Sequence, residues 1–150
     1  MPELVHEKQM RARVQEVWDF VKDQNNWAPF LMGYQNHQIL NDKESIWKLK
    51  SSIAGVTYSF KMEVLITEWE EGKKMGFELR GLTHPVKGSG TVTLKEAGSR
   101  LTDVSFHLHL QGRGITTPVM NLVVGPLLKP MAEQLLDKIN EVMEQTSVRA

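Results

Sequence analysis

Residues 34–112 alternate between apolar and polar side chains, and this alternation constrains the fold more than any other feature of the sequence. It divides into six segments, which cover residues 34–40, 45–53, 57–70, 74–80, 86–95 and 100–111. A period of two is typical of a β-strand with one buried face. The breaks between the segments are short and contain turn residues such as Gly55, Gly72 and Gly98. Short breaks produce hairpins, so the sequence predicts an antiparallel meander.

The apolar positions of these segments share one face of the predicted sheet. In the second segment, for example, Trp47 and Leu49 alternate with Lys48 and Lys50. An antiparallel sheet with one apolar face needs a further layer to cover that face. The predicted inner face comprises Trp47, Leu49, Ile53, Tyr58, Phe60, Met62, Val64, Ile66, Met75, Phe77, Leu79, Val92, Leu94, Val104, Phe106, Leu108 and Leu110.

The C-terminal stretch supplies the covering layer. Its apolar residues recur at helical spacing, which predicts one long helix over residues 118–145. Pro118 suits the first helical position, because its φ is preset and no N–H is needed there. About 28 residues at roughly 1.5 Å per residue make a rod of about 42 Å, long enough to cross a small domain. Gly125, Pro126 and Pro130 predict a kink in the first half of this helix.

Residues 1–33 complete the order of elements. We expect a weak strand over residues 4–10, a helix over residues 13–22, and a short second helix that Asn25 or Asn26 caps and Gly33 ends. The order is therefore strand, two short helices, six strands and a long helix. This order predicts an α+β fold in which a seven-stranded curved antiparallel sheet wraps around the C-terminal helix.

The composition excludes several classes of protein. Lys plus Arg and Asp plus Glu each total 18, so the chain lacks the net positive charge that a general nucleic-acid binder needs. Without cysteine it has no disulfide, thiolate nucleophile or thiolate metal site. The N-terminus lacks a signal-peptide core, and no apolar run reaches the ~18 residues of a membrane span. At 150 residues we expect a single domain, in the cytoplasm.

The order of elements and several short motifs resemble the START-like (SRPBCC) helix-grip superfamily. The residues that carry the resemblance are Val17-Trp18-Asp19-Phe20, Trp27-x-x-Phe30-Leu31-x-Gly33, Val86-x-Gly88-x-Gly90, Gly112, Gly114 and Leu128-x-Pro130. Within this superfamily the chain is most similar to the CoxG branch, which is named after carbon monoxide dehydrogenase, near the polyketide cyclase/dehydrase group. The resemblance covers nearly the whole chain. It implies an apolar cavity between the sheet and the C-terminal helix, which holds a lipid, quinone or polyketide-like molecule.

The residues themselves allow two interpretations of the inner face. Aromatic and methionine side chains at these spacings form a filled core in most proteins, whereas methionines also adapt to irregular cavities and varied guests. The resemblance favours the cavity. Tyr34, Gln38, Ser51 and Tyr58 are candidates to orient a guest. The predicted ligand contacts are Trp18, Trp27, Phe30, Leu31, Trp47, Leu49, Tyr58, Phe60, Met62, Met75, Phe77, Phe106, Leu108, Met120, Val124, Leu128 and Met131.

Two classes of function stay open. One is a non-catalytic carrier or accessory protein for an apolar small molecule. The other is a polyketide cyclase- or dehydratase-type enzyme, in which proximity alone can accelerate ring closure. The near absence of titratable groups on the inner face favours the carrier. Glu68 shares the inner-face parity and is a candidate general base, although a strand-end carboxylate that reaches solvent is the more common case.

Cofactors and partners follow from the same considerations. We expect no cofactor and no metal, because His107 and His109 share the outer face of a strand without a third ligand. The first half of the C-terminal helix is apolar almost all round, which suits a cavity wall and a homodimer contact. We predict that this half and residues 27–33 form the opening of the cavity, because its glycine and prolines make it the least stable part. The family resemblance alone suggests a molybdenum hydroxylase of the CO dehydrogenase type as a partner.

Overall fold

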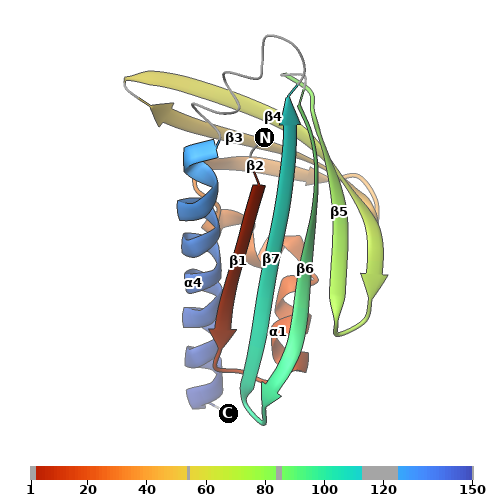
Figure 1. Cartoon of the computed structure of the whole chain (residues 1–150), viewed down its shortest axis with the longest axis vertical. Coiled ribbons are helices and arrows are strands. Elements are labelled where there is room, and N and C mark those ends of the chain that lie inside the picture. Colours follow the sequence, from red (N-terminus) through yellow and green to blue (C-terminus); the bar gives the residue numbers. More distant parts are fainter. Residues whose placement is uncertain (1–2, 54, 84–85, 113–124, 150) are drawn as a thin grey trace.

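The structure is a computed structural model that describes residues 3–53, 55–83, 86–112 and 125–149. Figure 1 shows its elements in chain order from red to blue. The helices and strands are β1 (Glu3–Met10), α1 (Val14–Val21), α2 (Gln24–Trp27), the 3-10 helix η1 (Ala28–Phe30), β2 (Tyr34–Ile39), β3 (Glu44–Ile53), β4 (Val56–Glu70), β5 (Lys74–Gly81), β6 (Val86–Gly98), β7 (Leu101–Gly112) and α4 (Gly125–Arg149).

Seven strands form one antiparallel sheet in the order β1-β7-β6-β5-β4-β3-β2. Strands β2 to β7 are neighbours in the chain and in the sheet, which confirms the predicted meander. The N-terminal strand β1 is added next to β7, where Leu4 lies opposite Leu108. The sheet curves, and α4 runs along it beside β1 (Figure 1). The predicted helix-grip architecture is therefore confirmed.

The inner face of α4 holds the helix against the sheet. Its buried side chains recur every three or four residues, as expected for an amphipathic helix on a core. They are Leu128, Ala132, Leu135, Leu136, Ile139 and Met143. They pack in two clusters, one with Leu4 and Leu108 and the other with Met10 and Trp18. At the rim, Lys8 Nζ of β1 lies 2.9 Å from the Asp137 carboxylate. Among the described residues, no helix has the length and apolarity that a membrane crossing requires.

A β-bulge in β4 changes the expected inner face. The register with β5 shifts between Ile66 and Glu68. An extra residue in one strand reverses the alternation beyond it, so side chains change faces. Glu68 is therefore exposed, and its carboxylate lies 2.7 Å from Lys74 Nζ. The Trp69 ring instead lies edge-on to the Trp18 ring, with 5.2 Å between the centroids. The general-base candidate Glu68 is thus a solvent-facing ion-pair residue.

Two helix ends also differ from the prediction. Helix α2 starts earlier than expected, because Asp23 is its cap: the carboxylate accepts from the Asn25 N–H at 3.0 Å. Helix α4 ends at Arg149, beyond the predicted end at residue 145. The predicted start at residue 118 lies outside the described residues.

Glu71, in the turn between β4 and β5, joins two tryptophans. The indole N–H of Trp18 donates to one of its carboxylate oxygens at 2.8 Å, and that of Trp69 donates to the other at 2.9 Å. These bonds, Trp69 first and Trp18 second, lower the pKa of Glu71 below its ordinary value because they favour the charged carboxylate. The turn is thereby fastened to α1.

We predict that Glu71 contributes a stability that acid removes. Its pKa is lowered in the folded protein, so the contribution is present above the unfolded value of about 4.3 and is lost as the pH falls through the folded pKa. The free energy of unfolding should therefore fall less between pH 5 and pH 3 in Glu71→Gln than in the wild type. Urea titrations at each pH measure this difference. Glu70→Gln is the control and should behave like the wild type; equal pH dependence in all three proteins would contradict the prediction.

Candidate functional site

A cavity of about 520 Å³ lies between the inner face of the sheet and the helices α1, α2 and α4. Well-packed protein interiors contain few voids larger than a single water. A space of this size is instead typical of binding sites for small molecules, which span roughly 300–1,000 Å³. Of the two interpretations of the inner face, the structure therefore supports the cavity.

Most residues that were predicted as ligand contacts line this cavity. They come from α1, α2, the segment before β2, the strands β3, β4, β5 and β7, and α4. They are Trp18, Trp27, Leu31, Trp47, Leu49, Phe60, Met62, Met75, Phe77, Phe106, Leu108, Leu128 and Met131. Their position in the wall follows from the structure, whereas their contact with a guest stays a prediction.

Other predicted site residues lie elsewhere. Phe30 stacks on Phe20 of α1 at 6.5 Å, and both rings pack against the larger core cluster. Tyr58 stacks on Phe60 at 6.5 Å, nearer the tip of the β3–β4 hairpin. Neither belongs to the cavity lining. Met120 and Val124 lie outside the described residues, as does most of the helix half that was predicted to form the opening.

Of the polar groups predicted to orient a guest, Tyr34, Gln38 and Tyr58 do not line the cavity. The Tyr34 hydroxyl instead bonds His37 Nδ1 at 2.6 Å, and Gln38 is exposed. The side chain of Ser51 lies outside the described residues. The polar side chain that does reach the wall from α2 is Gln24, which the sequence analysis missed. The second helix was expected to begin later, at an Asn25 or Asn26 cap. Gln24 was therefore expected to lie before the helix and was not considered as a lining residue.

Further lining residues come from the buried faces of α1 and α4. Val21, Leu135 and Ile139 recur at helical spacing, which predicts burial, whereas Leu136 was not among the predicted positions. Periodicity indicates which side chains turn inward, and it carries no signal for how far the facing layers stand apart. The sequence could therefore predict which residues face inward, but not that a cavity separates them.

Trp47 is the centre of a stack of rings at one wall. Its indole lies between His37 and Trp27, with centroid separations of 4.6 and 5.6 Å and nearly parallel planes. Its N–H donates to Ser45 Oγ at 2.9 Å. His37 is held in turn by Asn25, whose Oδ1 lies 2.7 Å from Nε2. The stack joins α2, β2 and β3 into one rigid wall.

We predict that Trp47→Ala costs about 3–5 kcal/mol of unfolding free energy. Trp47 is 4% exposed and is packed on both faces, so its truncation leaves a hole that its neighbours cannot fill. Urea unfolding measures the cost. Trp69→Ala is the comparison, because Trp69 is 45% exposed and should cost less. A cost for Trp47→Ala no larger than that for Trp69→Ala would contradict the rigid wall.

Glycines in β6 make room for large side chains of the neighbouring strands. A Cβ at Gly90 would lie 2.8 Å from Phe77 Cε2 and 2.9 Å from the His107 carbonyl oxygen. A Cβ at Gly88 would overlap Leu110 in the same way. From the sequence, these glycines were expected to give room for backbone bending or for a close helix approach, whereas the structure places side chains of neighbouring strands beside them. Without side chains at these positions, the Phe77 ring has room beside β6 in the cavity wall.

We predict that Gly90→Ala costs about 1–3 kcal/mol, because it forces the Phe77 ring away from β6. Phe77→Leu should relieve this conflict, so the double variant should cost less than the sum of the single variants by at least about 0.5 kcal/mol. Urea unfolding of the full cycle measures this coupling. Gly98→Ala is the control in the same strand, because its Cβ would meet Leu101 at an ordinary 3.5 Å. Additive costs would contradict the role of Gly90.

Polar residues gather at one end of the cavity. Lys50, Ser52, Lys61 and Thr83 line that end and are all exposed. Lys50 and Lys61 are the only titratable side chains among the described lining residues. The rest of the described wall carries no carboxylate, imidazole or phenol. Apart from Gln24, the cavity is therefore apolar in its depth, and it is polar where it reaches the surface.

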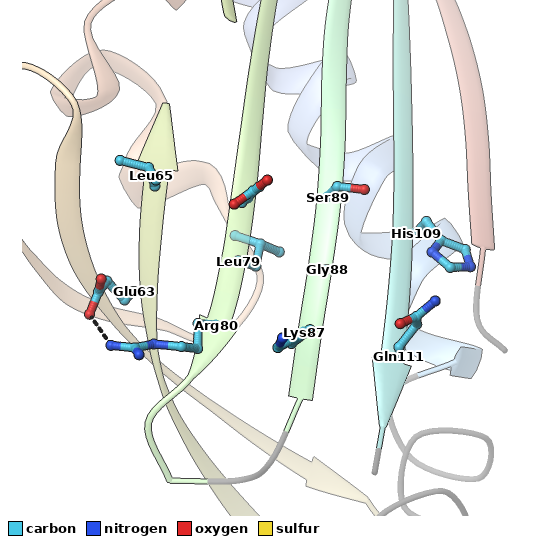
Figure 2. A pocket seen from close by; sticks show the side chains of 10 residues that line it. Glu63, Leu65, Leu79, Arg80, Lys87, Gly88, Ser89, His109 and Gln111 are labelled. Carbon is cyan, nitrogen blue, oxygen red and sulfur yellow. Dashed lines mark hydrogen bonds and ion pairs between the residues drawn. The ribbon is translucent and has the colours of Figure 1, made fainter. Parts of the chain in front are cut away.

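The outer face of the sheet has a second hollow of about 470 Å³ (Figure 2). Figure 2 shows Arg80 reaching toward Glu63, and its Nη2 lies 2.9 Å from the Glu63 carboxylate. Lys87 and Glu78 add one charge of each sign. This outer hollow is thus polar, open and balanced in charge. Its lining carries four charged side chains, whereas the inner cavity is walled mainly by apolar ones, which makes the inner cavity the candidate site.

The two strand histidines do not form a metal site in the described part of the chain. His107 Nε2 lies 2.9 Å from a carboxylate oxygen of Glu3. This contact lowers the pKa of Glu3. His109 lines the outer hollow. Among the described residues, no group of three or more His, Cys, Asp or Glu side chains is placed to hold a metal ion.

Known proteins share both the sequence pattern and the fold of this chain. The sequence profile of the family described as polyketide cyclase / dehydrase and lipid transport matches residues 1–144. No curated protein matches.

Solved structures share the fold over nearly the whole chain. A conserved protein from Geobacillus kaustophilus is similar with a TM-score of 0.82 at 15% identity, over 97% of both chains. A START superfamily protein from Mycobacterium smegmatis has a TM-score of 0.70 at 18% identity, over 97% of this chain and 99% of its own. The di-domain ARO/CYC StfQ from the steffimycin biosynthetic pathway has a TM-score of 0.66 at 8% identity, over 97% of this chain and 52% of its own. At these identities the likeness concerns the fold.

Proposed function

Because the chain belongs to the polyketide cyclase/dehydrase and lipid transport family, we propose that it binds an apolar small molecule between its sheet and α4. The cavity of about 520 Å³ is the observation that carries this proposal. Its walls are aromatic, aliphatic and thioether side chains, which favour the transfer of an apolar guest from water. The guest is a lipid, a quinone or a polyketide-like molecule.

The chemistry of the wall favours a carrier or accessory protein over an enzyme. General acid–base catalysis needs a titratable group within hydrogen-bond reach of the reacting atoms. In the described lining the titratable groups are the exposed amines of Lys50 and Lys61. The candidate base Glu68 is turned away from the cavity by the bulge in β4. The alternative, a cyclase that acts by holding a polyketide in a productive conformation, predicts conversion of such a substrate rather than its release unchanged.

Native mass spectrometry of the protein as purified tests the proposal directly. A co-purified guest should give a mass above that of the chain, and organic extraction should release the same compound. Denaturing spectra of the same sample should show the bare chain, because the guest is held without a covalent bond. A protein that carries no guest and takes up no apolar probe would contradict the proposal.

We predict that filling the cavity abolishes binding. Val64 lines the cavity, so the indole of Val64→Trp should occupy the space of a guest. Leu65→Trp is the matched control, because Leu65 is the next residue of β4 and lines the outer hollow instead. Uptake of a fluorescent apolar probe should be lost in Val64→Trp and kept in Leu65→Trp. Equal uptake by both variants would place the probe outside the cavity.

Within the family, we propose a role like that of the CoxG branch. The support is the motif Val17-Trp18-Asp19-Phe20 and the tryptophan-containing segment that follows it. Trp18 of this motif lines the cavity, and its indole N–H donates to Glu71. A partner of this branch would be a molybdenum hydroxylase of the CO dehydrogenase type. Affinity capture with such an enzyme, with and without the Val64→Trp change, would separate partner binding from guest binding.

A further inference from the structure

The β3–β4 hairpin carries positive charge, although the chain as a whole is neutral. Residues 48–62, which form most of this hairpin, contain three lysines and no Asp or Glu. Residues 63–78, by contrast, contain five glutamates and two lysines. The tip of the hairpin lies at the opposite end of the molecule from the β6–β7 turn and the C-terminus (Figure 1). Charge is therefore distributed unevenly, and one end of the molecule is basic.

The three lysines of the hairpin share its outer face. Lys48 lies directly opposite Lys61, and Lys50 is two residues further along β3. Positions two apart in a strand share a face, so all three lie opposite Trp47 and Leu49. They are exposed, and none of them forms an ion pair with another described residue. Like charges directly opposite each other destabilise a strand pair, so this arrangement is unfavourable until a negative charge meets it.

The neighbouring side chains of this outer face are uncharged. Ser52, Thr57 and Ser59 carry hydroxyls, and Ser52 Oγ lies 3.1 Å from Thr57 Oγ1. Leu82 lies beside Lys61, whose carbonyl oxygen accepts from the Leu82 N–H at 2.7 Å. The Leu82 side chain is 43% exposed. We refer to these residues together as the lysine face: Lys48, Lys50, Ser52, Thr57, Ser59, Lys61 and Leu82.

The lysine face borders the polar end of the cavity. Lys50, Ser52 and Lys61 belong to both. Val56, at the tip of the same hairpin, is 52% exposed. Ammonium groups next to exposed apolar side chains suit an anionic membrane surface. The ammonium groups bind the headgroups, while the apolar groups and the lysine stems reach the boundary of the acyl chains.

We propose that the lysine face docks the protein on an anionic phospholipid bilayer, so that the polar end of the cavity meets the membrane. The charges that lead to a docking surface are independent of guest binding. The choice of a bilayer over an acidic protein or a nucleic acid rests on the proposed function, because an apolar guest favours a bilayer over water. Docking is reversible, since each lysine strengthens binding to an anionic surface by only about fivefold.

Sedimentation with sucrose-loaded vesicles tests the proposal on the whole chain. Vesicles of phosphatidylcholine alone are compared with vesicles of phosphatidylcholine and phosphatidylglycerol in equal parts. The wild type should bind the anionic vesicles at least about tenfold more tightly, because only these attract the ammonium groups. Raising the salt from about 0.1 M to about 1 M shortens the Debye length from about 10 Å to about 3 Å, and it should remove this preference.

Removal of the three charges makes the test specific. The triple variant Lys48→Gln/Lys50→Gln/Lys61→Gln should bind both kinds of vesicle equally weakly. Without vesicles it should melt at the wild-type temperature or higher, because the repulsion between Lys48 and Lys61 has been removed. Lost preference together with a lower melting temperature would assign these lysines a structural role and overturn the proposal.

A second triple variant with the same net charge is the control. Lys73→Gln/Lys95→Gln/Arg100→Gln removes three positive charges at the β4–β5 and β6–β7 turns, away from the lysine face. The Leu94 N–H donates to the Lys73 carbonyl oxygen, which joins the strands that carry these residues. This variant should keep the preference for anionic vesicles to within about threefold of the wild type. An equal loss in both triple variants would overturn docking through the lysine face.

The remaining outcomes separate docking from guest binding. Val64→Trp fills the cavity and should still bind anionic vesicles, because Val64 lies on the inner face. Equal binding of the wild type to both kinds of vesicle would overturn the docking and leave the proposed function intact. Tighter binding to duplex DNA than to anionic vesicles would assign the lysine face to a nucleic acid and overturn the proposal. Docking by a protein that takes up no apolar guest would support the lysine face and overturn the proposed function.

Discussion

The structure depends on a mismatch of width between its two layers. Seven strands at about 4.8 Å spacing make a sheet roughly 29 Å wide, whereas a helix with its side chains is about 10–12 Å across. One helix cannot cover such a sheet, even when α1 and α2 add to the cover and the sheet curves around them. The sheet closes against α4 along β1 and β7, through a buried cluster that contains Leu4, Leu108 and Leu128. The cavity is the space that the helices leave uncovered.

Large aromatic side chains, together with glycines that make room for them, keep that space open. The Trp27–Trp47–His37 stack forms a wall that is fixed by hydrogen bonds on several atoms. Gly90 in β6 leaves room for the Phe77 ring beside the strand. A core built from medium-sized aliphatic residues would collapse around such a void. The residues that line a void lack van der Waals contacts on one side, and they regain these contacts by moving into it. Rigid rings combined with glycines prevent this collapse.

The sequence predicted the architecture well and the site in part, for physical reasons that differ. Alternation and helical spacing report which side chains face inward, and they placed residues such as Phe106 correctly. A bulge is a single inserted residue, and the residues around Thr67 give no sign of it. Alternation therefore gave Glu68 the inner-face parity, although the favoured interpretation was a strand-end carboxylate that reaches solvent, as the structure has it. Gln24 was missed because Asp23, rather than Asn25 or Asn26, caps the helix. The depth of the cavity is a tertiary property, which periodicity does not encode.

The order of the strands has a consequence for how the chain folds. Strands β2 to β7 can pair one after another as hairpins while the chain is being made, whereas β1 must wait for β7. The Glu3–His107 bond, for example, joins residues separated by 104 positions. Contacts of such high sequence separation form late and slow folding, because the loop between them must be closed first. Until β7 arrives, β1 is an unpaired strand on a growing chain, and this is the stage at which the protein is most exposed to misassembly.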